Sequence, residues 1–197
     1  MPEHAQQNLI LASESPRRIE LLKMLGFEFR VEPARINEAD ETIARDPFML
    51  PQELARMKAE DVGSRFPDAL VVGADTVVIL DGRALTKPRD DHEAAEFLKA
   101  LSGAVHTVVT GLAIKKAASA VLFSGKEETR VRFRELTKEE IDSYVASGEG
   151  RDKAGSYAVQ GLGACLVRSI EGCHYNVVGM PIALLFELMN RAAGTGG

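Results

Sequence analysis

A single carboxylate interrupts the most apolar stretch of the chain, because Asp75 lies within residues 69–80, ALVVGADTVVIL. A carboxylate in such surroundings must be paired, protonated or bound to a cation, since burying an unpaired charge carries a large desolvation cost. One interpretation is structural, with Asp75 capping a backbone turn or pairing with an arginine. The other is chemical, with Asp75 binding a metal ion or accepting a proton from water, and Glu38 in the acidic segment 36–41 acting as a second oxygen ligand.

Two arginines occupy an unusual place at the start of a predicted helix. Ser15 suits the N-cap and Pro16 the first helical position of a helix over 16–25. Arg17 and Arg18 then fall in the first turn, where the helix dipole is already positive and acidic residues are favoured. Guanidinium groups beside the free backbone N–H groups of a helix start suit a phosphate. The alternative is two solvated arginines, each losing only about 0.3–1 kcal/mol to the dipole.

Two lysines lie where they could reach the same site. Lys58 falls on the broad apolar side of a helix predicted over 51–66, so its ammonium either escapes to solvent past a packed stem or points into a site. Lys87 precedes Pro88, which favours an extended backbone. It follows the Asp75 strand closely enough in sequence to reach back toward that carboxylate.

The glycine-rich segment 147–164, SGEGRDKAGSYAVQGLGA, contributes Lys153 and Gln160. The Gln160 amide can both donate and accept hydrogen bonds, which reading the edge of a base requires. Cations for a polyphosphate, carboxylates for a divalent metal and an amide for a base together fit metal-assisted cleavage of a nucleoside triphosphate. The chain has no GxxxxGK[ST] loop and no GxGxxG motif after a strand, which disfavours P-loop hydrolases and kinases.

The elements that must position these residues alternate between strands and helices. Apolar runs and period-two alternation predict strands over 9–12, 27–31, 69–80, 105–114, 121–133 and near 165–170. Asp81 and Gly82 predict a tight hairpin after the third strand. Further helices are predicted over 90–101, from a Thr137–Glu140 capping box to Gly148, and from Pro181 onward. The pattern predicts an α/β fold with a mixed sheet flanked by helices.

Composition narrows the function classes. The chain has 197 residues, 45% of them hydrophobic, and a net charge of −5, which disfavours non-specific binding to nucleic acid polymers or membrane surfaces. No run approaches the roughly 18 apolar residues of a membrane span, and the N-terminus lacks the pattern of a signal peptide, so we expect a cytoplasmic protein. Cys165 and Cys173 are expected to be reduced, and no zinc-ligand spacing is present.

Six segments, in this order, closely resemble the Maf family of nucleotide pyrophosphatases: SESPRR (13–18), GADTVV (73–78), KPRD (87–90), LSGAVHTVVTG (101–111), DKAGSYAVQG (152–161) and NVVGMP (176–181). The DKAG motif with its downstream glutamine resembles the branch that hydrolyses dTTP and UTP. The resemblance implies one Maf-like domain over 1–197, with two lobes and the active site in the cleft between them, similar to inosine triphosphate pyrophosphatases. It also implies a divalent cation, Mg²⁺ or Mn²⁺, and the reaction NTP + H₂O to NMP + diphosphate.

The resemblance assigns roles position by position. Asp75 matches the proton acceptor, and Arg17, Thr76 and Gln160 match positions linked to the choice of base. The other matched polar residues of the cleft are Ser13, Arg18, Glu38, Lys58, Lys87 and Lys153. We therefore expect Asp75, Lys87 and Glu38 to be catalytic, with Asp75 and Glu38 also holding the metal. Two departures bear on this: Asn37 replaces an acid usual before the glutamate, and Ala158 replaces a glycine common before the glutamine.

Two other functions fit the same residues. The protein could be a nucleotide-sensing regulator of cell division with no significant turnover, or an enzyme acting on modified or non-standard nucleotides, as in other branches of the family. The long paired strands over 105–114 and 121–133 are also compatible with a homodimer. A panel of nucleoside triphosphates assayed with magnesium or manganese separates these alternatives.

Overall fold

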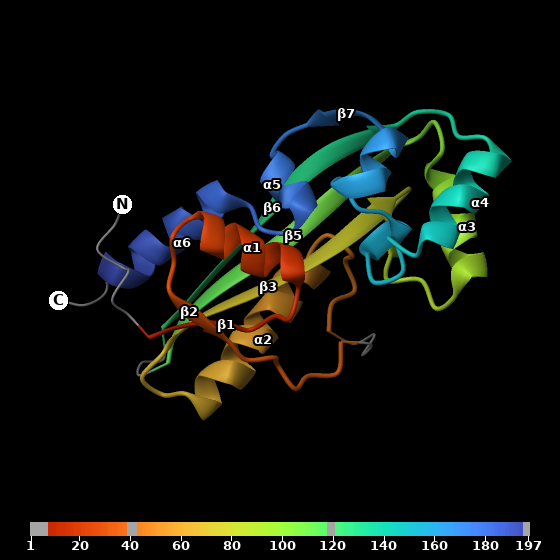
Figure 1. Cartoon of the computed structure of the whole chain (residues 1–197). Coiled ribbons are helices and arrows are strands. Elements are labelled where there is room, and N and C mark those ends of the chain that lie inside the picture. The colour runs from red at the N-terminus through yellow and green to blue at the C-terminus, as the bar shows by residue number, and fades with distance from the viewer. Residues whose placement is uncertain (1–7, 39–42, 118–120, 195–197) are drawn as a thin grey trace. The chain divides into compact units, whose positions relative to one another are not determined.

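The structure of the protein is a computed structural model that describes residues 8–38, 43–117 and 121–194 (Figure 1). The chain divides into two compact units. Unit 1 comprises Met1–Asp75, Thr110–Glu127 and Gly179–Gly197, and unit 2 comprises Thr76–Val109 and Glu128–Val178. The predicted acidic segment 36–41 lies partly outside the described residues, but its Glu38 lies within them.

Seven strands form one mixed sheet in the order β2-β1-β3-β5-β6-β7, with β4 paired to β3. The pairs of β1 with β2 and with β3 are parallel, whereas β3 with β4 and β6 with β7 are antiparallel, so the predicted mixed α/β sheet is confirmed. The strands are β1 (Leu9–Leu11), β2 (Phe29–Val31), β3 (Leu70–Leu80), β4 (Arg83–Leu85), β5 (Val105–Lys116), β6 (Leu122–Phe133) and β7 (Val167–Glu171). Strand β3 is buried along nearly its whole length, as its double-sided apolar pattern predicts.

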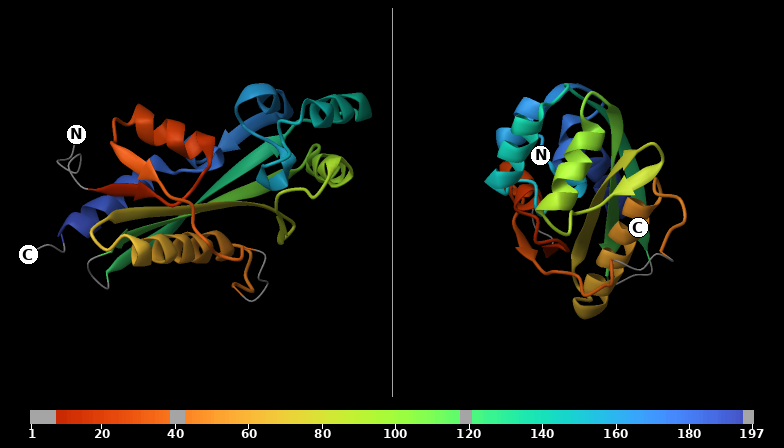
Figure 2. Two further views of the ribbon diagram at one scale, coloured as in Figure 1. Left: turned by 60° about the horizontal axis from the view of Figure 1, so that its bottom comes forward. Right: turned by 90° about the vertical axis from the view of Figure 1, so that its right-hand side faces the viewer.

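Three helices belong to unit 1: α1 (Pro16–Met24), α2 (Leu50–Arg65) and α6 (Ile182–Gly194). Helices α1 and α6 cover one face of the strands of this unit, and α2 covers the other (Figure 2). Phe27, just after α1, contacts Phe186 of α6 with ring centroids 5.9 Å apart. Under α2, the buried apolar residues of α2 and of strands β1, β3 and β5 form one cluster.

Helix α2 approaches strand β3 closely at Gly73. A Cβ atom on Gly73 would lie 2.1 Å from the carbonyl oxygen of Ala55 in α2, far inside van der Waals contact. Only glycine therefore allows the two backbones to come this close. Because Lys58 follows Ala55 by three residues, it lies on the same side of α2, toward the strand that carries Asp75.

Unit 2 contains α3 (Asp91–Leu101), α4 (Lys138–Ser147) and the short α5 (His174–Val178). Helices α3 and α4 lie side by side (Figure 1), and Asp91 of α3 forms an ion pair with Arg151 at 2.8 Å. The glycine-rich segment forms two short 3₁₀ helices, η2 (Ala154–Ser156) and η3 (Gly161–Leu166). The core of this unit packs around Leu98, Val108 and Phe133.

The local sequence signals are largely confirmed. Thr137 and Glu140 form the predicted capping box, and Gly148 ends α4 in the left-handed conformation. Helix α5 was not predicted, and the segment 147–164 was predicted only as a loop. Cys165 and Cys173 are both free thiols, as expected. Within the described ranges, no helix is long and apolar enough to cross a membrane.

Candidate active site

Lys58 is the centre of a charged cluster in unit 1. Its Nζ lies 2.7 Å from Oδ1 of Asp75 in β3 and 2.8 Å from Oε1 of Glu38 in the loop after β2. The Lys58 and Asp75 side chains are only 8% and 12% exposed, whereas Glu38 is 45% exposed. Of the two interpretations of Lys58, escape of the ammonium to solvent is wrong. The cation that burial of Asp75 demands is this lysine.

The cluster is held by the packing of two elements. Asp75 is fixed by the buried strand β3, and Lys58 extends from the face of α2 that rests on that strand. An isolated charge at this depth would be strongly destabilising, but opposite charges in hydrogen-bond contact offset much of the desolvation cost. On one side the pair contacts Glu38, whose side chain is 45% exposed.

Arg18 of α1 adds a second buried cation to this region. Its Nε donates to the carbonyl of Gly179 at 2.9 Å, and its Nη1 donates to Oγ of Ser13 and to the carbonyl of Ala74, each at 3.0 Å. Burial lowers the pKa of Arg18, while the charge of Asp75 acts in the opposite direction. The guanidinium thus ties the start of α1 to the residue that precedes Asp75.

The start of α1 differs in detail from its prediction. Ser15 occupies the N-cap position and Pro16 begins the helix, but the Ser15 side chain makes no capping hydrogen bond. Ser13 Oγ instead accepts from the backbone N–H of Ser15 at 3.3 Å and from Arg18. Arg17 is partly buried, and its charge acts on neighbouring Arg18 to lower the pKa of that guanidinium. The cations of this first turn therefore lie close together, and one of them is buried in the protein.

The remaining predicted residues belong to unit 2. Lys87 is exposed in the loop after β4, and Gln160 is exposed at the N-cap of η3. Lys153 is mostly buried and pairs with the adjacent Asp152. A hydrogen bond from Gly155 N to the carbonyl of Thr86, 3.2 Å, joins the segments that carry Lys87 and Lys153. Thr76, half-buried, directly follows Asp75 on β3.

Sequence reasoning missed Glu149 in the same segment. Its carboxylate accepts hydrogen bonds from the backbone N–H groups of Leu162 and Gly163, at 2.9 and 2.8 Å, and so holds the turn that follows Gln160. The available signal was an acidic residue between glycines in the loop 147–164, but a charged loop residue is most often solvated.

The site contains few side chains that could serve as metal ligands. Among residues 8–38, 43–117 and 121–194, no group of three or more His, Cys, Asp or Glu side chains is arranged to hold one. Oδ1 of Asp75 and Oε1 of Glu38 nevertheless both lie within 2.8 Å of the same cation, the Lys58 ammonium. Magnesium is commonly held by one or two carboxylates together with substrate phosphates and water, so this donor pair fits such an ion.

A model of the family described as Maf-like protein matches residues 8–192 of this chain. The chain belongs to the Maf family. The resemblance seen in the six sequence segments is therefore confirmed. The matched range, residues 8–192, includes every predicted site residue.

Similar Maf proteins span nearly the whole chain. The protein named dTTP/UTP pyrophosphatase from Pelotomaculum thermopropionicum is 46% identical over 185 residues, covering 94% of this chain and 96% of that one. Proteins of the same name from Aquifex aeolicus and Deinococcus radiodurans are 46% and 45% identical, covering 95% and 98% of this chain and 98% and 97% of their own. Among solved structures, a HAM1 protein from Coxiella burnetii has a TM-score of 0.41 and 16% identity, covering 65% of this chain and 73% of its own.

Proposed function

We propose that this Maf protein is a nucleoside triphosphate pyrophosphatase that hydrolyses dTTP and UTP to the monophosphate and diphosphate. The observation that carries the proposal is the buried Lys58–Asp75 pair with Glu38 at its exposed side. Relatives at 45–46% identity that bear the name dTTP/UTP pyrophosphatase support the choice of substrate. The general reaction class thus rests on the site, and the base preference rests on the relatives.

In the proposed reaction Asp75 acts as the general base. Its carboxylate accepts a proton from a water molecule, and the water oxygen forms a bond to the α-phosphorus. The bond from this phosphorus to the bridging oxygen breaks, and diphosphate leaves with the electron pair. Lys58 orients the carboxylate through its 2.7 Å contact, so that the other oxygen of Asp75 is left to accept the proton. Positioning and neutralisation of phosphate charge supply most of the catalysis in such reactions.

Asp75 and Glu38 are also the residues that would hold a divalent cation, Mg²⁺ or Mn²⁺. Bound there, the ion would neutralise charge on the phosphate oxygens. Since both carboxylates contact Lys58, we expect ion binding to loosen one of these contacts. The exposed Glu38 is the partner that can move at lower cost, because its side chain is 45% exposed.

The proposal assigns the remaining predicted residues to the substrate. Lys87 would act on the phosphates as a catalytic cation, and Lys153, Arg18 and Ser13 would bind the phosphate chain. Arg17, Thr76 and Gln160 would influence the choice of base. That these groups act together in a cleft between two lobes stays a prediction, as does a homodimer. The free thiols at Cys165 and Cys173 fit the reducing conditions of the cytoplasm, where we propose the protein acts.

The proposal is tested by assaying the purified protein with dTTP, UTP, CTP, dATP and GTP in the presence of Mg²⁺ or Mn²⁺. Diphosphate is detected as phosphate after adding an inorganic pyrophosphatase, and omission of that enzyme shows whether single phosphates are released instead. We expect turnover of dTTP and UTP above the others, and none after chelation of the metal. Tight binding without turnover would contradict the proposal and favour a nucleotide sensor. Turnover confined to added base-modified nucleotides would favour the other alternative.

A further inference from the structure

The segment that presents Gln160 is held by side chains from α4 and the turn after it. Glu149 Oε2 accepts from Leu162 N at 2.9 Å, and Oε1 accepts from Gly163 N at 2.8 Å. The Tyr144 hydroxyl of α4 donates to Glu149 Oε1 at 3.1 Å and accepts from Ala158 N at 3.2 Å. Backbone groups on both sides of Gln160 are thus fixed by two linked side chains.

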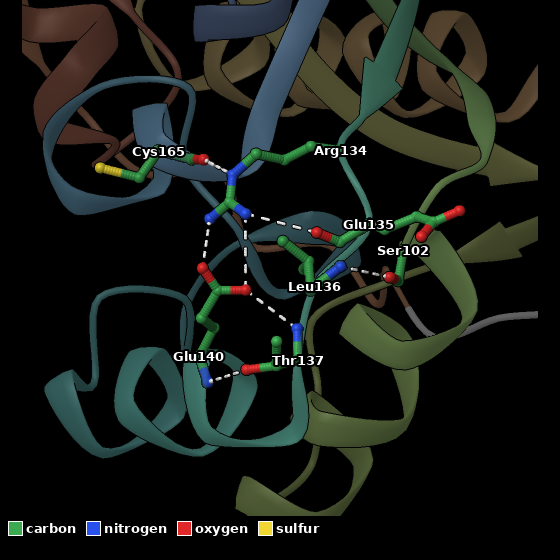
Figure 3. Close-up of polar contacts among 7 residues, drawn as sticks. All are labelled: Ser102, Arg134, Glu135, Leu136, Thr137, Glu140 and Cys165. Atoms are coloured by element: carbon green, nitrogen blue, oxygen red, sulfur yellow. Dashed lines mark hydrogen bonds and ion pairs between the residues drawn. The ribbon is translucent and has the colours of Figure 1, made fainter.

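The far end of the same segment is fixed by Arg134, at the end of β6 (Figure 3). Its Nε donates to the carbonyl of Cys165 at 2.5 Å, and its backbone N–H donates to the carbonyl of Leu166 at 3.0 Å. Arg134 Nη2 also binds Glu140 Oε1 at 2.8 Å, and Glu140 belongs to the capping box of α4. Helix α4 is therefore connected to both ends of the segment 158–166.

The backbone around Gln160 is shaped to receive the Glu149 carboxylate. Gly161 has a positive φ of 67°, and a Cβ atom there would lie 2.6 Å from Oε2 of Glu149. At Gly163 a Cβ atom would lie 2.0 Å from the carbonyl oxygen of Ala158. The turn is therefore folded tightly around the carboxylate, while Gln160 itself stays exposed at its outer side.

We propose that Glu149, supported by Tyr144, is a positioning residue that fixes Gln160 and thereby sets discrimination among nucleotide bases. The inference rests on the proposed function, in which Gln160 contacts the base. A site that selects by hydrogen bonding discriminates only as well as its donor and acceptor are held in place. An exposed glutamine in a loop would otherwise sample several orientations. The bonds from Glu149 and Tyr144 restrict the backbone that carries it.

The electrostatics of Glu149 agree with this role. Burial acts to raise its pKa, but the hydrogen bonds from Gly163, Leu162 and Tyr144, together with the charge of Lys153, bring the pKa below its ordinary value. The carboxylate is therefore ionised at neutral pH. In the ionised form both oxygens are acceptors, which suits these three donors.

The test compares Glu149→Gln with wild type, using the ratio of kcat/KM for dTTP to that for CTP. An amide keeps one acceptor oxygen but places an NH₂ group against a backbone N–H, so one of the bonds to Leu162 and Gly163 is lost. We expect the ratio to fall about tenfold and the amides of Leu162 and Gly163 to exchange hydrogen faster. Tyr144→Phe, which removes only the hydroxyl, should change the ratio in the same direction by about threefold.

The matched control is Asp142→Asn, which removes a carboxylate from α4 that pairs with Lys138 on the exposed surface. It should leave both the ratio and the amide exchange unchanged. A uniform loss of turnover for all nucleotides in Glu149→Gln, with the ratio unchanged, would mean a purely structural role and overturn the inference. If Glu149→Gln fails to fold by circular dichroism, Tyr144→Phe provides the same comparison.

Failure of the inference is distinguishable from failure of the proposed function. Wild-type turnover of dTTP with an unchanged ratio in both variants overturns the positioning role and leaves the pyrophosphatase intact. Absence of wild-type turnover on every nucleotide overturns the proposed function and the positioning role with it. Gln160→Ala serves as the reference, and a ratio unchanged in that variant would also overturn the inference.

Discussion

Each unit of the molecule contains a deeply buried pair of titratable side chains in hydrogen-bond contact, and these two pairs differ in charge. In unit 1, Lys58 Nζ lies 2.7 Å from Asp75, and both groups are ionic. In unit 2, His106 Nε2 lies 2.7 Å from the Tyr157 hydroxyl, and the two rings pack edge-on with Phe133. Burial lowers the pKa of His106 to about 4 and raises the pKa of Tyr157, so both groups are neutral at pH 7.

The difference shows what decides whether a buried group stays charged. Burial alone drives a titratable group to its neutral form, as at His106 and Tyr157. Lys58 and Asp75 are also buried, but each contacts an opposite charge, and Glu38 extends the cluster toward solvent. A charged buried pair stabilises a fold weakly at best, whereas a neutral hydrogen bond among aromatic rings stabilises it at lower cost. We therefore connect the charged pair with chemistry and the neutral pair with folding.

The largest effect is expected for Asp75→Asn, which tests the chemical half of this comparison. The asparagine oxygen can still accept from Lys58, but the group can no longer take a proton from water. Turnover of dTTP should fall by about 100-fold or more, while the thermal unfolding midpoint should fall less than in Lys58→Met, because Lys58 keeps its contact with Glu38. Diphosphate release and circular dichroism melting measure the two quantities. Near-normal turnover would rule out Asp75 as the base.

Lys58→Met tests whether the buried charge of Asp75 is compensated by the Lys58 ammonium. Loss of the ammonium leaves Asp75 buried without its hydrogen-bonded counter-charge, so the free energy of unfolding should fall by about 3 kcal/mol. Urea denaturation at pH 7 measures it. In the matched double variant, Lys58→Met with Asp75→Asn, the uncompensated charge is gone and part of this stability should return. A double variant no more stable than Lys58→Met would show that lost packing, not charge, is the cause.

His106 makes the stability depend on pH. The folded chain protonates His106 only below about pH 4, whereas in the unfolded chain this occurs near its ordinary 6.5. Between these values the unfolded state binds more protons, so stability is lost as pH falls, by about 3 kcal/mol in total. His106→Gln should remove that part of the pH dependence, as measured by urea denaturation at pH 7 and 4.5. An equal change in unfolding free energy between pH 7 and 4.5 in wild type and variant would be inconsistent with a neutral buried histidine.

The smallest effect concerns uncharged polar groups at the starts of two helices. Thr137→Ala removes the hydroxyl that caps α4 and should reduce stability by about 1 kcal/mol. Ser15→Ala is the control, because Ser15 occupies the N-cap of α1 without a capping hydrogen bond. Its unfolding free energy in urea should stay within about 0.5 kcal/mol of wild type. Equal losses in the two variants would show that capping geometry is not the relevant difference.

The sequence predicts those parts of the fold whose signals are local. The double-sided apolar run around Asp75, the hairpin residues Asp81 and Gly82, and the capping box of α4 each specify their structure within a few residues. Helix α5 could not be predicted in this way. It contains the buried Asn176, whose Nδ2 binds the carbonyl of Val108 and the hydroxyl of Thr129, residues distant in sequence.

The candidate site likewise has features that local sequence predicts and features that depend on contacts between distant segments. The burial of Asp75 predicted that a cation must face it, but the identity of that cation depends on the packing of α2 against β3. Glu149 stood out only as an acidic residue between glycines, because its partners include the backbone amides of Leu162 and Gly163, and backbone amides leave no pattern in a sequence. The roles of Lys87, Lys153 and Gln160 stay predictions, since they depend on a bound nucleotide.

The close contact between Gly73 and the Ala55 carbonyl has a consequence for how the protein can change. Because main chain rests directly on main chain there, even one added methyl group would push α2 outward and lengthen the reach of Lys58 to Asp75. The absence of a side chain at position 73 therefore sets the separation of α2 and β3, and with it the geometry of the Lys58–Asp75 ion pair.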